Sequence, residues 1–172
     1  MTAEEIMHLL NLKPLPLEGG YYRETYRSAD VLAAGTLERF AKAKAVCTAI
    51  YYLLTPETFS ALHRLPTDEV YHFYLGDAVE LVQLLPDGKL ETVTLGPDLA
   101  NGQQVQAVVP RGVWQGSRLR AGGRFALMGT TMAPGFDFDD YEPGEREKLL
   151  VHYPGASDWI EALTRPSPSR FE

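Results

Sequence analysis

The chain has 172 residues, of which 45% are hydrophobic and 23% are charged, a balance typical of one folded domain with its own core. The formal net charge of −7 favours neither nucleic acid nor an anionic membrane surface as a partner, so we expect a small-molecule ligand. A single cysteine, Cys47, excludes an internal disulfide, and no apolar run reaches membrane-spanning length. We therefore expect a cytoplasmic protein.

The N-terminal segment predicts a short helix. Thr2-Ala-Glu-Glu5 matches the S/T-x-x-E capping box, and the apolar residues that follow have helical spacing. The helix is expected over residues 3–11. Lys13-Pro-Leu-Pro16 ends it, because proline lacks the amide hydrogen that a helix needs.

An aromatic segment, residues 21–27, follows a glycine pair and predicts a strand. Strict alternation places Tyr22 and Glu24 on one face and Arg23 and Arg27 on the other. The two arginines are suited to clamping a carboxylate or phosphate of a ligand. A charged, exposed strand edge that discourages aggregation is an equally compatible interpretation.

The rest of the chain predicts many short strands joined by tight turns. This density of strands is typical of an antiparallel sandwich or barrel. We expect one domain over residues 1–165 and a loose tail over residues 166–172. Helices are expected over residues 144–151 and 159–164, and residues 29–44 are expected as a loop or short exposed helix without a chemical role. The expected strands cover residues 48–54, 69–76, 77–85, 89–94, 104–110 and 124–132.

The stretch from His63 to Gly76 is the strongest candidate for a functional site. His63 is expected at the end of one strand and Glu69 at the start of the next, with residues 66–68 turning the chain between them. An imidazole and a carboxylate that face one cavity are able to hold a divalent metal or to act as an acid/base pair. The alternatives are a hydrogen-bonded barrel histidine and an exposed glutamate at a strand start.

Strand parity divides the residues that follow. Glu69, Tyr71 and Phe73 share one face, and we expect them to face the cavity. His72 lies on the opposite face unless a bulge intervenes, so we expect a structural or interface role for it.

Two further segments contribute candidates. Pro110-Arg-Gly-Val-Trp114-Gln115 predicts a turn before a strand, with Gln115 suited to hydrogen-bond an uncharged polar ligand group. Trp114 is expected to pack in the core or to frame the mouth of the pocket. The acidic run of residues 136–142 contains Tyr141, and a solvated turn is its favoured interpretation.

The stretch from His63 to Gly76 resembles the first motif of the cupin superfamily, in which His-x-His is followed by Glu and then by Gly. His63, Glu69 and Gly76 match this motif, while Leu65 replaces its second histidine. Gln115 likewise replaces the histidine of the second motif, Pro-x-Gly-x-x-His. Any metal would have His63, Glu69 and Gln115 as ligands, and an amide oxygen is a weak ligand for zinc, copper or iron. We expect no cofactor, with a loosely held divalent metal as the alternative.

The chain as a whole resembles a small cupin-like family known as domain of unknown function 985, or cupin group 5, from residue 3 to about residue 165. The blocks that carry the resemblance are residues 15–28, 48–54, 59–63, 68–74, 109–116 and 133–138. The resemblance implies an all-β antiparallel jelly-roll barrel with short N-terminal and C-terminal helices, similar to the RmlC-like sugar-nucleotide epimerases and usually a homodimer. In the epimerases' mechanism His63 is the base, Glu69 orients it and Tyr141 returns the proton.

The leading functional hypothesis is binding of a small polar or sugar-like metabolite in the barrel cavity. The cavity is expected to be lined by His63, Glu69 and Gln115, with Arg23, Glu24, Tyr71, Phe73 and Trp114 as further ligand-binding candidates. The first alternative is a metal-independent isomerase or epimerase acting on a nucleotide sugar or related carbonyl compound. A metal-dependent oxygenase or decarboxylase is the third hypothesis.

Overall fold

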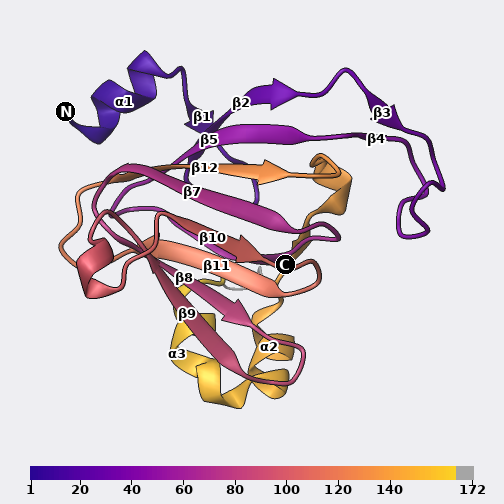
Figure 1. Ribbon diagram of the computed structural model, residues 1–172. Coiled ribbons are helices and arrows are strands. Elements are labelled where there is room, and N and C mark those ends of the chain that lie inside the picture. Colours follow the sequence, from indigo (N-terminus) through magenta and orange to yellow (C-terminus); the bar gives the residue numbers. More distant parts are fainter. Residues whose placement is uncertain (166–172) are drawn as a thin grey trace, which may run out of the picture.

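Two antiparallel β-sheets face each other in the computed structural model, which describes residues 1–165 (Figure 1). The expected tail over residues 166–172 lies outside the described residues. In sheet order, the six-stranded sheet contains β1 (Lys13–Pro14), β2 (Tyr21–Arg27), β5 (Thr48–Leu54), β12 (Ala126–Met132), β7 (Glu69–Gly76) and β10 (Gln106–Val109). The five-stranded sheet contains β13 (Glu142–Pro143), β6 (Phe59–Arg64), β11 (Trp114–Leu119), β8 (Val79–Leu84) and β9 (Leu90–Leu95). The predicted antiparallel sandwich or barrel is confirmed.

Three short α-helices lie outside the sheets: α1 (Ala3–Leu9), α2 (Arg146–His152) and α3 (Ser157–Ala162). The predicted capping box is present, because the Thr2 hydroxyl accepts the Glu5 amide N–H and the Glu5 carboxylate accepts the Thr2 amide N–H. Single 3₁₀ turns occur at Leu99–Asn101, Phe138–Asp140 and Pro154–Ala156. None of the helices in residues 1–165 is long and apolar enough to cross a bilayer.

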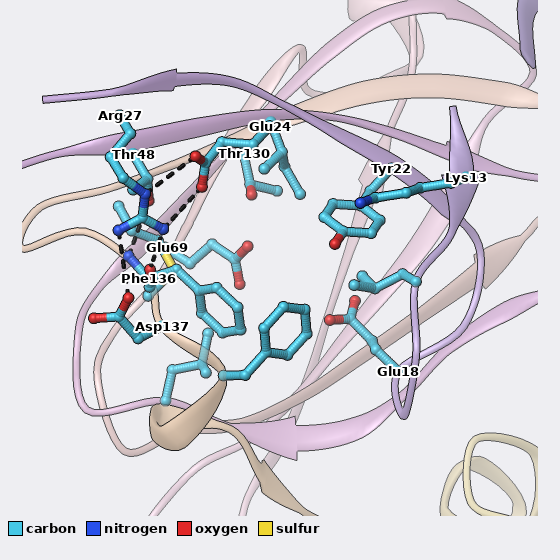
Figure 2. Close-up of a pocket in the computed structure, with 15 residues that line it drawn as sticks. Lys13, Glu18, Tyr22, Glu24, Arg27, Thr48, Glu69, Thr130, Phe136 and Asp137 are labelled. Carbon is cyan, nitrogen blue, oxygen red and sulfur yellow. Dashed lines mark hydrogen bonds and ion pairs between the residues drawn. The ribbon is translucent and has the colours of Figure 1, made fainter. Parts of the chain in front are cut away.

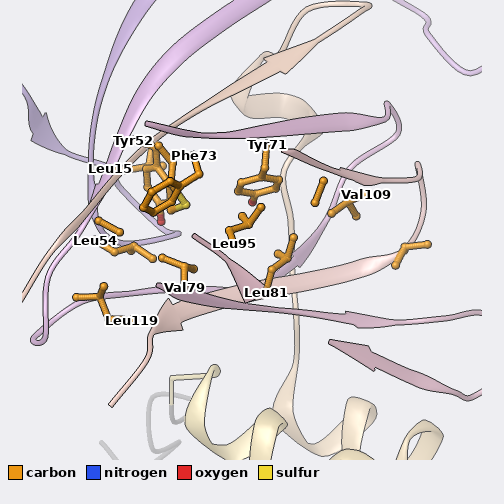
Figure 3. Close-up of a cluster of buried hydrophobic side chains, with 14 residues drawn as sticks. Leu15, Tyr52, Leu54, Tyr71, Phe73, Val79, Leu81, Leu95, Val109 and Leu119 are labelled. Carbon is orange, nitrogen blue, oxygen red and sulfur yellow. The ribbon is translucent and has the colours of Figure 1, made fainter. Parts of the chain in front are cut away.

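The main core fills the space between the two sheets (Figure 3). Tyr52 and Tyr71 from the six-stranded sheet meet Leu81 and Leu95 from the five-stranded sheet, and each of these side chains is at most 1% exposed. Smaller apolar clusters lie outside the sheets, where α2 and α3 cover the five-stranded sheet and α1 covers the six-stranded sheet. Both sheets are therefore held at fixed separation, and the polar cavity described below lies at one end of this core.

Strand β7 divides its side chains between two faces as predicted. Glu69, Tyr71 and Phe73 are buried, whereas His72 lies on the outer face with its Nε2 3.2 Å from the Thr131 hydroxyl. Alternation along an extended strand was sufficient here because no bulge interrupts residues 69–73.

Strand β2 departs from strict alternation. Its pairing with β5 shifts register between Glu24 and Tyr26, so a β-bulge at Thr25 brings Arg27 to the face that carries Glu24. The prediction that Arg27 shares a face with Arg23 is therefore wrong.

Residues 29–44 form an excursion from the barrel (Figure 1). Its ends pair as the two-residue strands β3 (Val31–Leu32) and β4 (Lys44–Ala45). The residues between them form a loop, which is the first of the two expected alternatives. Lys44 is only 4% exposed and its ammonium group pairs with Asp137 and Asp140. The acidic run is therefore ion-paired through Asp137 and Asp140, while its other acidic side chains remain solvated, with Asp139 74% and Glu142 52% exposed.

Candidate functional site

A cavity of about 280 Å³ opens at the edge of the six-stranded sheet (Figure 2). Its walls come from β1, β2, β5, β7 and β12, from the loop that carries Glu18, and from the segment that carries Phe136 and Phe138. Glu18 and Glu69 both point into the space between these elements. The cavity therefore combines a carboxylate interior with a partly aromatic wall.

A tight backbone turn places Glu18. Gly19 has a φ of +110°, and a Cβ atom there would lie 2.4 Å from the Phe59 carbonyl oxygen, so only glycine lets the chain pass this close to β6. The Glu18 carbonyl accepts the Ala61 amide N–H over 3.0 Å, and the Ser60 hydroxyl donates to Glu18 Oε1 over 2.7 Å. The loop therefore fixes both the backbone and the carboxylate of Glu18.

His63 lies directly behind Glu18. Its Nδ1 is 2.8 Å from the Ala61 carbonyl oxygen, and because a carbonyl only accepts hydrogen bonds, Nδ1 carries the proton. Nε2 then faces Glu18 Oε2 at 4.0 Å, and the Tyr141 ring stacks on the imidazole with centroids 4.9 Å apart. With only 1% of its surface exposed, His63 reaches the cavity through Glu18 and is not part of the wall.

Glu69 and Gln115 form a buried hydrogen-bonded pair. Gln115 stands opposite His63 in the pairing of β6 with β11, and its Nε2 donates to Glu69 Oε2 over 2.8 Å. Burial raises the pKa of the Glu69 carboxyl group, and the nearby Glu18 carboxylate raises it further. The Gln115 Oε1 atom is buried and has no hydrogen-bond partner in the described part of the chain.

A charged network borders the cavity (Figure 2). The Arg27 guanidinium pairs with Glu24 at 2.8 Å and with Asp137 at 3.3 Å, and it also donates to the Phe136 carbonyl. Lys44 Nζ approaches Asp137 Oδ2 at 2.6 Å from the other side. The positive charge of Arg27 is thus already balanced by protein carboxylates.

Aromatic rings form the remaining wall. Phe136 and Phe138 meet edge to face with centroids 5.3 Å apart. Tyr22 stands across from them on β2, and the Lys13 ammonium lies 5.4 Å from the centre of its ring. These π faces provide contact surface for the apolar part of a ligand or for a cation.

The remaining candidates lie away from the cavity wall. Arg23 is on the outer face of the sheet with its guanidinium over the Tyr51 ring at 5.3 Å, and Trp114 packs against the cluster beneath α2 and α3. Tyr71 and Phe73 belong to the core between the sheets. Of the nine residues predicted from the sequence, Glu24 and Glu69 line the cavity. His63 and Gln115 lie behind the cavity wall, and Tyr141 stacks on His63.

Tyr141 has a buried hydroxyl that finds no hydrogen-bond partner within residues 1–165. Burial raises the pKa of this phenol, and the Glu18 carboxylate adds to the effect. Tyr141 therefore presents a neutral O–H group close to the ring of His63.

Sequence reasoning missed Glu18 as a site residue. The carboxylate precedes Gly19 and Gly20, and the pair was interpreted only as a flexible opening to a strand. Both glycines have positive φ, and the preceding Leu17 has a φ of 69° although it is not glycine. The sequence feature that could have identified Glu18 is an acidic residue directly before a glycine pair, because such a turn fixes the position of the carboxylate.

The donor atoms do not fit a tightly held metal ion. In residues 1–165 no group of three or more His, Cys, Asp or Glu side chains is arranged to bind one. Gln115 turns an N–H group toward Glu69, and Leu65 contributes an apolar wall to the cavity where the motif's second histidine would stand. A set with one imidazole directed at Glu18 and one carboxylate bonded to an amide lacks the ligand geometry of transition-metal sites.

A double-sheet antiparallel barrel with a polar cavity at one end defines a cupin jelly roll, and the chain belongs to the family described as Cupin superfamily (DUF985), whose model matches residues 4–143. The family resemblance and the jelly-roll fold expected from the sequence are confirmed.

Three relatives show how far the likeness extends. The protein SO0799 from Shewanella oneidensis has 35% sequence identity and a TM-score of 0.87, covering 97% of this chain and 99% of that one. A hypothetical protein from Leishmania major has 32% identity and a TM-score of 0.88, covering 96% and 100% of the two chains. The uncharacterized protein YML079W from Saccharomyces cerevisiae is 32% identical over 149 residues, covering 80% of this chain and 73% of that protein.

Proposed function

We propose that this protein binds a small polar metabolite in the barrel cavity. The observation that carries the proposal is that Glu18 and Glu69, from two different elements, both face one cavity that also has an aromatic wall. Buried carboxylates are costly unless they are paired, so a structural role alone gives no reason to place two of them there. Cavities that hold drug-sized ligands start at about 300 Å³, and the volume of about 280 Å³ therefore fits a ligand the size of one sugar ring or amino acid.

The test is a thermal-shift screen of sugars, polyols, amino acids and amines against the wild type and Glu18→Gln. Ligands stabilise a folded protein in proportion to the logarithm of their concentration relative to the dissociation constant. We expect saturable stabilisation of the wild type and a weaker effect for Glu18→Gln. Glu57→Gln, an exposed carboxylate outside this cavity, is the matched control and keeps the wild-type response. The proposal is wrong if no compound stabilises the wild type, or if Glu18→Gln responds like the control.

Proton transfer is the second candidate function, because His63 and Tyr141 lie in contact behind Glu18. The Nδ1 proton of His63 is held by the Ala61 carbonyl, which leaves Nε2 free to accept a proton, and Tyr141 keeps a neutral O–H group nearby. Glu18, not Glu69, is the carboxylate within 4.0 Å of the imidazole among the described residues. An isomerase or epimerase built this way would move a proton α to a carbonyl through Glu18, with His63 as its positioning partner.

Deuterium exchange separates the two candidate functions. Compounds that stabilise the protein are incubated with it in D₂O, and their C–H signals are followed by proton NMR. Loss of one signal with the wild type and not with His63→Gln supports proton transfer. If no stabilising compound exchanges, the isomerase proposal fails and ligand binding stands alone.

A metal-dependent oxygenase or decarboxylase has the least support from the donor atoms. Mass spectrometry of untagged protein purified without chelator measures metal content directly, with His63→Ala prepared in parallel. Near-stoichiometric metal that is lost in His63→Ala would restore that hypothesis. We expect the metal content of the two proteins to be equal and far below one ion per chain.

The homodimer implied by the family resemblance remains a proposal. Tyr74 and Val108 support it, because both are about half exposed on the outer face of β7 and β10 at the edge of the six-stranded sheet. Light scattering across a dilution series measures the mass in solution. A mass of one 19.1 kDa chain at every concentration would contradict the proposal.

A further inference from the structure

We propose that the cavity selects a positively charged ligand, one that carries an ammonium or guanidinium group between Glu18 and Glu69 and rests its carbon frame on the aromatic wall. The inference rests on the proposed ligand-binding function and adds the charge class of the ligand to it. It also separates this protein from enzymes that bind phosphate-bearing substrates in the same fold.

The charges that line the cavity are unequal. Four carboxylates face it, from Glu18, Glu24, Glu69 and Asp137, against two cations, Lys13 and Arg27. The charge of Arg27 is compensated by its ion pairs with Glu24 and Asp137, and Asp137 also pairs with Lys44. Lys13 is exposed and lies over the Tyr22 ring. The cavity interior is therefore left with a negative charge.

The two interior carboxylates have no cationic side chain of their own. In the described part of the chain neither Glu18 nor Glu69 has a lysine or arginine nitrogen within 4.0 Å of its carboxylate, and the charged neighbour of Glu18 is His63 at that distance. Arg165 approaches Glu18, but its guanidinium donates to the backbone carbonyl over 3.1 Å. A ligand cation in the cavity would supply the positive partner that the protein does not provide for Glu18 and Glu69.

The partners that Glu18 and Glu69 do have point in the same direction. Ser60 donates one hydroxyl to Glu18, and Gln115 donates one N–H to Glu69. A carboxylate has acceptor capacity for about four hydrogen bonds, so each keeps lone pairs free for a donor in the cavity. An ammonium or guanidinium group offers three to five N–H donors and no acceptor, which matches this arrangement.

The aromatic wall suits the same ligand. Tyr22, Phe136 and Phe138 line the same cavity as the two carboxylates. The ring faces attract cations and also bury methylene or methyl groups. Lys13 at 5.4 Å from the Tyr22 ring centre shows that a cation already lies close to this wall.

The same inventory argues against anionic ligands. A diphosphate or carboxylate in the cavity would meet Glu18 and Glu69, whose carboxylates have no lysine or arginine partner within residues 1–165. Arg27, which lines the cavity, is already paired with Glu24 and Asp137. Like charges at close range repel each other strongly in a partly buried site, where water screens them little. A nucleotide sugar therefore fits this cavity poorly, in contrast to the substrate suggested by the resemblance to the epimerases.

Two matched ligand series test the inference by titration calorimetry. The first is glucosamine, glucose and glucuronate, which share one frame and carry charges of about +1, 0 and −1 at neutral pH. The second is choline and 3,3-dimethylbutan-1-ol, which have the same shape, differ in the charge of the central atom and both lack N–H donors, so this pair tests the charge apart from the hydrogen bonds. We expect glucosamine or choline to bind in saturable fashion, and their neutral and anionic counterparts to bind about tenfold more weakly or not at all.

Variants locate the effect. Glu18→Gln and Glu69→Gln each remove one charge with little change in shape, and each is expected to weaken cation binding about tenfold. Glu91→Gln on β9 removes a charge of the same sign from an exposed position outside the cavity and leaves the affinity unchanged.

The outcomes separate this inference from the proposed function. If glucose or glucuronate binds as tightly as glucosamine and Glu18→Gln weakens it, the cavity binds a ligand but the charge selection is wrong. Equal affinity of wild type, Glu18→Gln and Glu69→Gln for a cation likewise overturns the selection. If no member of either series binds, the cation proposal is overturned, and the wider metabolite screen alone decides the proposed function.

Discussion

Gln115 donates a hydrogen bond from Nε2 to Oε2 of Glu69 across 2.8 Å, and both side chains are buried. The glutamine stands where the second cupin motif has a histidine, and in this chain the position donates a hydrogen bond to an acid. The bond lowers the pKa of Glu69, opposing the increase that burial causes. The hydrogen bond therefore favours the charged form of Glu69, whereas burial favours the neutral form.

Replacing Gln115 by leucine removes the hydrogen bond that the glutamine Nε2 group donates to Glu69. We expect Gln115→Leu to lower the free energy of unfolding by about 1–3 kcal/mol, because a buried acceptor loses its partner. The measurement is urea unfolding followed by circular dichroism, with the exposed Gln104→Leu as control. Equal stability of the two variants would show that the hydrogen bond is not formed in solution.

The raised pKa of Glu69 predicts a specific pH dependence. A carboxyl group whose pKa is higher in the folded than in the unfolded state stabilises the fold fully below its unfolded pKa, and this contribution is lost as pH rises through the folded pKa. Glu69→Gln keeps the shape of the neutral acid, and the Gln115 amide can rotate to present its unpartnered Oε1. The variant should therefore gain stability relative to wild type as the pH rises from the ordinary pKa of a glutamate through the raised pKa of Glu69, by about 1.4 kcal/mol per unit of pKa increase.

Unfolding of the wild type and Glu69→Gln at several pH values between 4 and 8 checks this sign. Because both proteins share every other titrating group, the difference between them isolates Glu69. A difference that stays constant with pH, or that favours the wild type as pH rises, contradicts the raised pKa.

Lys44 and Lys42 offer a matched pair of ion-pair deletions. Lys44 is 4% exposed and pairs with Asp137 and Asp140, whereas the side chain of Lys42 is 79% exposed and pairs with Asp139. Lys44→Met leaves the mostly buried Asp140 without its lysine and leaves Asp137 with Arg27 alone, and it is expected to cost about 2–3 kcal/mol. Lys42→Met is expected to have no measurable effect, because exposed pairs contribute little.

Hydrogen exchange localises the consequence of the Lys44 change. The amides of residues 136–141 should exchange faster in Lys44→Met, since these residues lose the anchor that holds them beside the cavity. Unchanged exchange in this segment would mean that other contacts hold it, such as the Phe136 amide donating to the Thr48 hydroxyl over 2.9 Å.

Gly19→Ala tests the turn that places Glu18. The added Cβ would lie 2.4 Å from the Phe59 carbonyl oxygen, so the loop must move in addition to adopting an unfavourable φ. Gly88→Ala is the control, because Gly88 has a φ of +85° with open space around its Cβ position. We expect Gly19→Ala to lose at least about 1 kcal/mol more than the control and to lose ligand binding, which Gly88→Ala keeps.

The sequence predicted the strands well because their apolar alternation is local. Residues 48–54 and the inward face of Glu69, Tyr71 and Phe73 follow from a period of two. The bulge at Thr25 was not predictable, since an extra residue in a strand leaves no compositional mark when its neighbours are all β-prone. That single bulge turns Arg27 toward the cavity, whereas strict alternation would have left it on the outer face with Arg23.

The site was harder to predict because its contacts are long-range. Glu18 reaches Ser60 across 42 positions, and Lys44 reaches Asp137 across 93. Lys44 lies in an alanine-rich stretch without periodicity, and the acidic run has the composition of a solvated turn. Only the folded arrangement shows that each provides the charge that the other needs.

The most direct test of the central claim is a ¹H–¹⁵N NMR titration of the wild type with glucosamine, which reports where the ligand binds. The account predicts saturable shifts clustered at the amides of Gly19, Gly20, Glu69, Thr130 and Asp137, beside the two carboxylates, and their loss in Glu18→Gln. Shifts confined to other surfaces, or the same shifts in Glu18→Gln, would contradict a ligand held between Glu18 and Glu69.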